Sequence, residues 1–256
     1  MKILCVGDSI IKGEYGENFV SRMQGQLPQT KFVNKGINGA TLNKIAYTLL
    51  EEIENRPYYD IIILLAGAND IVMPTYPNRG PLYKFAYRHQ QKKGFHPITS
   101  ISKFEQFYTD LLLELKRKCR AKIILATLGP LDELAGSITN QQRLAYNDCI
   151  RNIALQQRCC LADAGAICDE ETASLPQRSY LLGNFWNLLL FDRFIGIFKK
   201  GNDWLSRKRR LHLTIDGVHL NGKGAQVFAD TILDCILEIR KRAIMGRKKD
   251  YANWTR

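Results

Sequence analysis

The sequence predicts an α/β protein: a three-layer α/β/α sandwich around a mostly parallel sheet of five strands. Short apolar runs of strand length alternate with amphipathic stretches of helix length, and this βαβα order favours parallel strands with helices on both faces. The run Asp60–Ala66 (DIIILLA) is almost entirely apolar, as expected for a strand that is covered on both faces. A chain of 256 residues, 45% of them hydrophobic, is large enough for one domain with a buried core.

Five strands and five helices are expected along the chain. The strands are Lys2–Val6, Lys31–Asn34, Asp60–Ala66, Lys122–Thr127 and Cys160–Asp163. The helices are Glu17–Leu27, Thr41–Glu54, Ser102–Arg117, Asn140–Gln157 and Asn221–Arg242. The helix that begins at Thr41 has the clearest pattern, because Leu42, Ile45, Leu49 and Ile53 recur at helical spacing behind Thr41 as N-cap.

A single domain over residues 1–242 is expected, with insertions at about 71–100 and 170–212 and a basic C-terminal tail at 243–256. Both insertions are longer than ordinary connections, and long insertions at strand ends often form lids or binding loops. Within the second insertion, Tyr180–Phe198 has the length of a membrane span, but polar and charged residues interrupt it. One charge at the centre of a span raises the free energy of membrane insertion by about 2.5–3.5 kcal/mol. We therefore expect a helical lid, with an interfacial element that dips into lipid as the alternative.

The positive charge is concentrated in two segments. The formal net charge is +12, and residues 199–210 and 240–256 together hold thirteen basic residues against two acidic ones. Such segments attract phosphate head groups, nucleic acid or acidic substrates. A solvated face that only aids solubility explains the same pattern.

The cysteines and the N-terminus both indicate a reducing compartment. The seven cysteines are scattered, odd in number and without a CxxC pair, which predicts reduced, mostly buried thiols and no metal site. The first strand begins at Lys2, which leaves no room for a secretion signal. We expect a cytoplasmic protein.

Two short motifs contain the residue types of a serine hydrolase. Gly7-Asp8-Ser9 follows the first strand directly, at the strand end where parallel α/β folds bind ligands. Asp216-Gly217-Val218-His219 precedes the last helix. An imidazole can deprotonate a serine hydroxyl near neutral pH, and a carboxylate three residues away can hold the ring in one tautomer. Taken singly, each motif is equally explained by a helix cap.

Two further positions could stabilise a developing oxyanion. Gly39, after the second strand, lacks a Cβ that would keep its N–H away from a ligand, and Asn69, after the third strand, offers a side-chain amide. A simple turn at Asn38-Gly39 and a helix cap at Asn69-Asp70 are the structural alternatives. The remaining histidines, His89, His96 and His212, lie outside these motifs and are expected at the surface, and Asp163 is expected to cap a helix.

Taken together, the ordered motifs resemble the SGNH hydrolase superfamily, also called GDSL esterases and lipases, over nearly the whole chain. The resemblance rests on GDSI at 7–10, the block around Gly39, GAND at 67–70 and DGVHLN at 216–221. It implies a flavodoxin-like fold, Ser9 as nucleophile and oxyanion donor, and His219 as base. By the same resemblance Asp216 orients His219, and Gly39 and Asn69 complete the oxyanion hole. Ile10 replaces the usual leucine, and the GxSxG elbow of α/β-hydrolases is absent.

The resemblance implies a carboxylic ester hydrolase that works through an acyl-enzyme and requires no cofactor and no metal. The expected partner is a small-molecule ester, with lipid-like acyl esters favoured by the apolar second insertion. A carbohydrate O-deacetylase and a thioesterase or acyltransferase of the same fold remain alternatives. A different class of function is a basic module for membranes or nucleic acid on a hydrolase scaffold. Peripheral contact with an anionic membrane surface is compatible with both functions, whereas the complete catalytic set makes nucleic acid the less favoured partner.

Overall fold

Five parallel strands form one sheet in the order β2-β1-β3-β4-β5 in the computed structural model of the chain. The structure describes residues 1–256 except 57, 187–189, 197–200 and 255–256. The strands are β1 (Lys2–Gly7), β2 (Lys31–Gly36), β3 (Ile61–Leu65), β4 (Lys122–Ala126) and β5 (Cys160–Ala162). The predicted five-stranded α/β sheet is thus confirmed, and every pairing in it is parallel.

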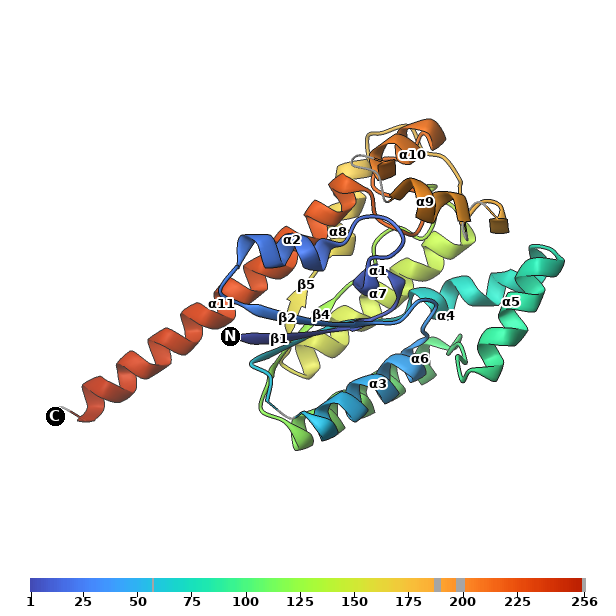
Figure 1. The fold of residues 1–256 in the computed structure, drawn as a ribbon. Helices are drawn as coiled ribbons and strands as arrows, with labels where there is room; N and C mark the ends of the chain where they lie inside the picture. The colour runs from blue at the N-terminus through green and yellow to red at the C-terminus, as the bar shows by residue number, and fades with distance from the viewer. Residues whose placement is uncertain (57, 187–189, 197–200, 255–256) are drawn as a thin grey trace.

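Helices cover both faces of the sheet, as the βαβα order predicts (Figure 1). One face carries α3 (Leu42–Asn55), α6 (Ile101–Lys118) and α7 (Ile138–Gln156), and the other carries α2 (Phe19–Gln26), α8 (Ala164–Thr172) and α11 (Gly222–Trp254). These helices pack because their apolar residues recur on one side: in α6, Phe104, Tyr108, Leu111 and Leu115 are all buried.

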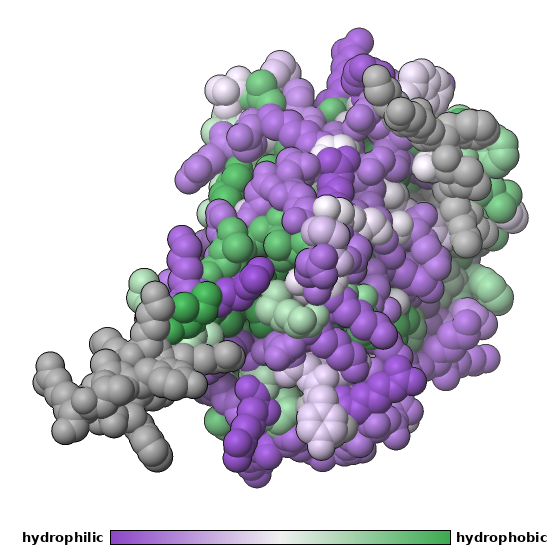
Figure 2. Space-filling model, turned by 60° about the vertical axis from the view of Figure 1, so that its left-hand side comes forward, coloured by the Kyte–Doolittle hydropathy of each residue, from purple (hydrophilic) through white to green (hydrophobic). Residues whose placement is uncertain are grey.

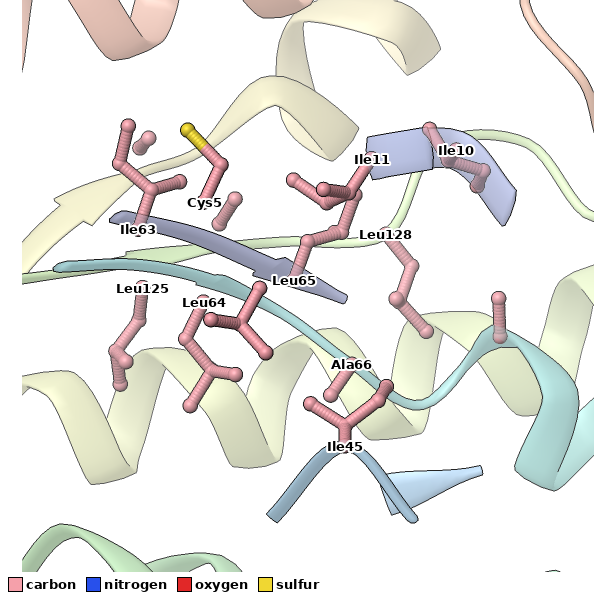
Figure 3. Close-up of a cluster of buried hydrophobic side chains, with 14 of the residues drawn as sticks. Cys5, Ile10, Ile11, Ile45, Ile63, Leu64, Leu65, Ala66, Leu125 and Leu128 are labelled. Atoms are coloured by element: carbon pink, nitrogen blue, oxygen red, sulfur yellow. The ribbon is translucent and has the colours of Figure 1, made fainter. Parts of the chain in front are cut away.

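The central strand β3 explains the apolar run of the sequence. All five of its residues are buried, and Figure 3 shows Ile63 and Leu64 on opposite faces of the sheet, packed among Cys5, Leu125 and Ile45. Full burial of one such side chain contributes about 1.5–3 kcal/mol. The strand therefore anchors the loop that follows it to the densest part of the core.

Both insertions contain helices: a helical lid over 180–198 was expected in the second insertion, whereas no helix was expected in the first. The first holds a 3-10 helix, η1 (Met73–Asn78), and α5 (Pro81–Lys92), and the second holds α9 (Asp192–Gly196) and α10 (Gly201–Arg209). The short helices α1 (Ser9–Lys12), α4 (Ala68–Val72) and α8 were also missed, since helices this short show little periodicity. Part of the expected helical lid, at 187–189 and 197–198, lies outside the described residues.

Two expectations need correction. Thr41 occupies the N-cap position of α3, but its hydroxyl donates to Asn43 Oδ1, and it is Asp70 Oδ2 that accepts the Leu42 N–H, at 2.9 Å. The last helix does not end at Arg242: α11 continues to Trp254 through most of the predicted tail. The structure also shows why position 7 is a glycine: a Cβ there would lie 2.5 Å from the Leu65 carbonyl oxygen, so no larger residue fits between β1 and β3.

The opposite end of the sheet from the predicted site carries a hollow of about 950 Å³. It lies at the amino ends of the strands and is lined by residues such as Ile61, Ile123, Leu161 and Ile239. Figure 2, in which this end of the molecule comes forward, shows apolar side chains gathered on it. All seven cysteines are free thiols. Within the described residues, no helix has the length and apolar character to cross a membrane.

Candidate active site

Ser9 lies at the carboxyl end of β1, as the first residue of α1. Asp8 caps this helix, since its Oδ1 accepts the Ile10 N–H at 2.9 Å. The cap turns the chain sharply after the strand and directs the Ser9 hydroxyl away from the sheet toward the loop before α11. The side chain of Ser9 is held in a largely buried position, 6% exposed.

The structure brings Ser9, His219 and Asp216 into one hydrogen-bonded chain. Ser9 Oγ lies 3.0 Å from His219 Nε2, and His219 Nδ1 lies 2.7 Å from Asp216 Oδ2. The other oxygen of Asp216 accepts the main-chain N–H groups of Val218 and His219, at 3.1 and 2.8 Å. Asp216 is therefore both a cap of its own turn and the partner of the imidazole, so both interpretations of the DxxH motif hold.

Electrostatics favour an ionised Asp216 beside a basic imidazole. Burial raises the pKa of Asp216, but His219 and the two main-chain N–H groups outweigh burial and leave it below its ordinary value. For His219, burial lowers the pKa, but the charge and hydrogen bond of Asp216 outweigh it, so the pKa ends above its ordinary value of 6.5. The ring also packs against Tyr15, at 5.2 Å between centroids. The imidazole is thus fixed in place and made a stronger base.

Hydrogen bonds draw the loops after β1, β2 and β3 together around Ser9. Asn69 Nδ2 donates to the Ala40 carbonyl at 3.1 Å and makes a longer contact of 3.4 Å with Asp8 Oδ2. Burial raises the pKa of Asp8 to about 6. The Asn69 contacts therefore hold the loop that contains Gly39, the neighbour of Ala40, close to the loop that contains Asp8 and Ser9. No group in the described part of the chain accepts the main-chain N–H of Ser9 or Gly39.

The first insertion reaches this corner of the site. A Cβ on Gly39, whose φ is +76°, would lie 2.6 Å from the Gln90 Nε2 atom of α5. The Gln90 Oε1 atom is buried and accepts no hydrogen bond from the described residues. Asp70, which follows β3, holds the start of α3 and the end of the first insertion in place, because it accepts the N–H groups of Leu42 and Ile98. Burial raises the pKa of Asp70 to about 7.

The described residues contain no group of three or more histidine, cysteine, aspartate or glutamate side chains that could hold a metal ion. The chemistry available at this site is that of a hydroxyl, an imidazole and a carboxylate in sequence, with main-chain and amide N–H groups beside them.

Comparison with protein families gives the same assignment as the geometry. Residues 5–227 match the model of the GDSL-like lipase/acylhydrolase family, a range that contains every residue of the hydrogen-bonded chain. The chain belongs to this family. The resemblance drawn from the four motifs is confirmed, and the protein is a carboxylic ester hydrolase of the GDSL type.

Solved structures share the fold of this GDSL-family hydrolase. Axe2, an acetylxylan esterase from Geobacillus stearothermophilus, is 20% identical, and the match covers 92% of this chain and 93% of that one with a TM-score of 0.61. The acetyl xylan esterase AlAXEase is 22% identical, and the match covers 92% of this chain and 100% of that one with a TM-score of 0.59. No curated protein matches the sequence.

Two acidic residues that the motifs do not contain support residues 212–219, the loop that carries the acid Asp216 and the base His219 and is called the acid–base loop below. Glu133 accepts three main-chain N–H groups, from His212, Leu213 and Thr214, at 2.5–2.9 Å, together with the Thr214 hydroxyl at 2.6 Å. Asp132 donates its N–H to the Gly217 carbonyl at 2.7 Å. Both residues follow β4, and no spacing in the sequence links them to residues eighty positions later.

The second insertion is also tied to the acid–base loop. The Leu182 N–H donates to the Asp216 carbonyl at 2.7 Å. Arg209 donates to both oxygens of Asp192, at 2.6 and 2.9 Å, and to the Ile215 carbonyl at 2.7 Å. Arg209 therefore does not belong to an exposed basic face, as its position within 199–210 had indicated.

Proposed function

We propose that this hydrolase cleaves carboxylic esters with Ser9 as nucleophile, His219 as general base and Asp216 as the residue that orients the base. The observation that carries the proposal is the unbroken chain Ser9 Oγ, His219 Nε2, His219 Nδ1, Asp216 Oδ2, with links of 3.0 and 2.7 Å. A hydroxyl, a base and an orienting carboxylate at these distances are the requirements for an activated serine. Axe2 supports the same roles, because its solved catalytic mutants replace a serine, a histidine and an aspartate.

In the acylation step, Ser9 Oγ forms a bond to the ester carbonyl carbon while its proton moves to His219 Nε2. The carbonyl oxygen becomes the oxyanion. As this intermediate collapses, the bond to the alcohol oxygen breaks, and His219 Nε2 returns the proton to that oxygen. Water then repeats the sequence on the acyl-enzyme: its oxygen bonds the carbonyl carbon, its proton passes through His219 to Ser9 Oγ, and the acid leaves.

The oxyanion is assigned to the main-chain N–H groups of Ser9 and Gly39 and the side-chain amide of Asn69. The two N–H groups have no acceptor in the described residues. They lie on loops that are joined through the Asn69 contacts with Ala40 and Asp8. The second proton of Asn69 Nδ2 makes only the 3.4 Å contact with Asp8, so a nearer, charged oxygen would replace it. Each such donor contributes about 2.7–4 kcal/mol to lowering the barrier.

Lipid-like acyl esters are the substrate class that the surroundings of the site support. Aromatic side chains of the two insertions pack against one another. The ring centroids of Tyr76 and Tyr83 are 5.2 Å apart, and those of Tyr83 and Phe185 are 5.3 Å apart. Arg79 joins the insertions through the carbonyls of Leu181 and Gly183. Tyr76 and Tyr83 are buried in this packing, so the two insertions meet through an apolar interior near Asp216, and apolar surroundings suit an acyl chain better than a hydrated substrate.

Carbohydrate deacetylation is the second candidate, favoured by the acetylxylan esterase activity of the proteins with the same fold. Turnover of p-nitrophenyl esters from acetate to decanoate separates the two candidates. Activity that rises with chain length supports the lipid-like substrate, and a strict preference for acetate supports deacetylation.

The catalytic assignment is tested with Ser9→Ala and a fluorophosphonate probe. The substitution should abolish turnover of p-nitrophenyl acetate while circular dichroism shows an unchanged fold. The probe should label the unsubstituted protein on Ser9 and leave the variant unlabelled. Turnover retained by the folded variant would refute the role of Ser9.

A further inference from the structure

The helix α10 exposes a tryptophan and buries several polar residues. Asn202, Ser206 and Arg209 are buried against the body of the protein together with Leu205. Trp204 lies outside this buried set, with 43% of its surface exposed. A surface helix normally turns its large apolar residues inward, so the exposed Trp204 departs from that pattern.

Basic side chains share the outward face of α10. Arg207 and Lys208 stand three and four residues after Trp204 and are exposed, and at this spacing the three side chains lie next to one another along the helix. Lys208 Nζ lies 4.9 Å from the centre of the Trp204 ring. Within the described part of the chain, no acidic side chain pairs with either cation.

The neighbouring helix α9 adds apolar surface. It packs against α10, where Gly201 approaches Ile195 and Gly196 approaches Asn202. Asp192 is buried by its ion pair with Arg209, which turns the preceding large residues outward. The exposed apolar side chains of the second insertion are Trp186, Leu190, Phe191, Phe194 and Trp204.

This surface adjoins the candidate active site. Figure 1 shows α9 and α10 at the same end of the molecule as α1, beyond the carboxyl ends of the strands. The inward residue Arg209 reaches the carbonyl of Ile215, directly before Asp216. A lipid layer that contacted the outward face would therefore lie at the same end of the molecule as Ser9 (Figure 1).

We propose that the outward face of α9 and α10 docks onto an anionic lipid bilayer, and that the ester substrate is taken from that bilayer. Tryptophan and other large apolar side chains enter the interface between head groups and acyl chains, while Arg207 and Lys208 remain at the level of the phosphates. Charge complementarity selects an anionic surface over a neutral one. The second part of the proposal rests on the proposed esterase function, and the docking itself does not.

Docking is tested by co-sedimentation with vesicles of phosphatidylcholine alone and of phosphatidylcholine mixed with phosphatidylglycerol. The full chain is used with Ser9→Ala, so that no lipid is hydrolysed during the measurement. Two variants alter the face, Trp204→Ser and the pair Arg207→Gln/Lys208→Gln. Two controls alter exposed residues at the far end of the molecule, Tyr58→Ser and the pair Arg117→Gln/Arg120→Gln.

The protein should sediment with the anionic vesicles, and less so as salt rises. Removal of both charges should weaken binding roughly 20- to 30-fold, because each basic residue near an anionic surface contributes a factor of about five. Trp204→Ser should weaken binding as well, and the controls should bind like the parent. Failure of the parent to sediment, equal binding by face variants and controls, or retention by DNA but not by vesicles would overturn the proposal.

A second measurement keeps the two proposals apart. With Ser9 restored, the face variants should hydrolyse soluble p-nitrophenyl acetate at the rate of the parent but lose turnover of an ester embedded in anionic vesicles. Equal loss on both substrates would contradict a docking role. Loss of soluble turnover in the parent itself would instead refute the esterase function.

Discussion

Glu133→Gln is the substitution that best tests how the acid–base loop is held in place. The Glu133 side chain is 7% exposed and accepts four hydrogen bonds from His212, Leu213 and Thr214. Three of the four donors converge on Oε1 and one on Oε2. The loop that Glu133 holds continues directly into Asp216 and His219.

Glutamine can place its single oxygen at the Oε1 position and keep three of the four bonds. Its amide nitrogen then faces the His212 N–H, which loses its acceptor at a cost of about 1–3 kcal/mol. The three retained bonds lose charge assistance, about 1 kcal/mol each, and the smaller cost of burying a neutral group offsets part of this. We expect a net destabilisation of about 2–4 kcal/mol, which in a domain of this size lowers Tm by about 5–15 °C.

The same substitution should reduce kcat by about 10- to 100-fold at temperatures well below its Tm, because a shift of about 1 Å in a catalytic group costs about that much. Thermal unfolding and p-nitrophenyl acetate kinetics measure the two effects separately. Glu171→Gln is the matched control, since Glu171 forms an exposed ion pair with Lys223, which contributes about 0–1 kcal/mol. A variant with wild-type Tm and kcat would refute the idea that Glu133 supports this loop. A lower Tm with unchanged kcat would show that Glu133 stabilises the fold without positioning Asp216 and His219.

Three further substitutions test the site. Asp216→Asn should lower kcat about 10,000-fold. It should also move the acid limb of the pH–rate profile to lower pH, because activity falls as His219 gains a proton and Asp216 raises the pKa of His219. An acid limb at unchanged pH would argue against the pairing of Asp216 with His219. Asn69→Ala should reduce kcat about 100- to 1,000-fold with little change in KM, and a change in KM alone would exclude Asn69 from the oxyanion hole. Gly217→Ala should destabilise the fold by about 1–3 kcal/mol from backbone strain alone, because φ at this position is +87°. The new Cβ would in addition lie 1.8 Å from the Tyr180 carbonyl oxygen. A calorimetric unfolding transition like that of the wild type would contradict this.

The fold class and the residues brought together at the site followed from local pattern. Apolar runs such as Asp60–Ala66 specify strands that are covered on both faces, and parallel strands place their carboxyl ends at one edge of a sheet. For that reason Ser9 and Asn69 could be expected near each other, and the DxxH motif already placed Asp216 beside His219. Helix boundaries were less determined, since α11 continues through residues that had suggested a basic tail.

Only the tertiary structure decided which residues support the site and which way the second insertion faces. Glu133 contacts the loop before His219 across about eighty positions, and such a contact leaves no periodic trace in the sequence. Arg209 had the composition of a basic surface, yet its ion pair with Asp192 turns it inward and leaves Trp204 outward. Local sequence fixes the spacing of side chains along one element, whereas the partner that each side chain meets depends on how distant elements pack.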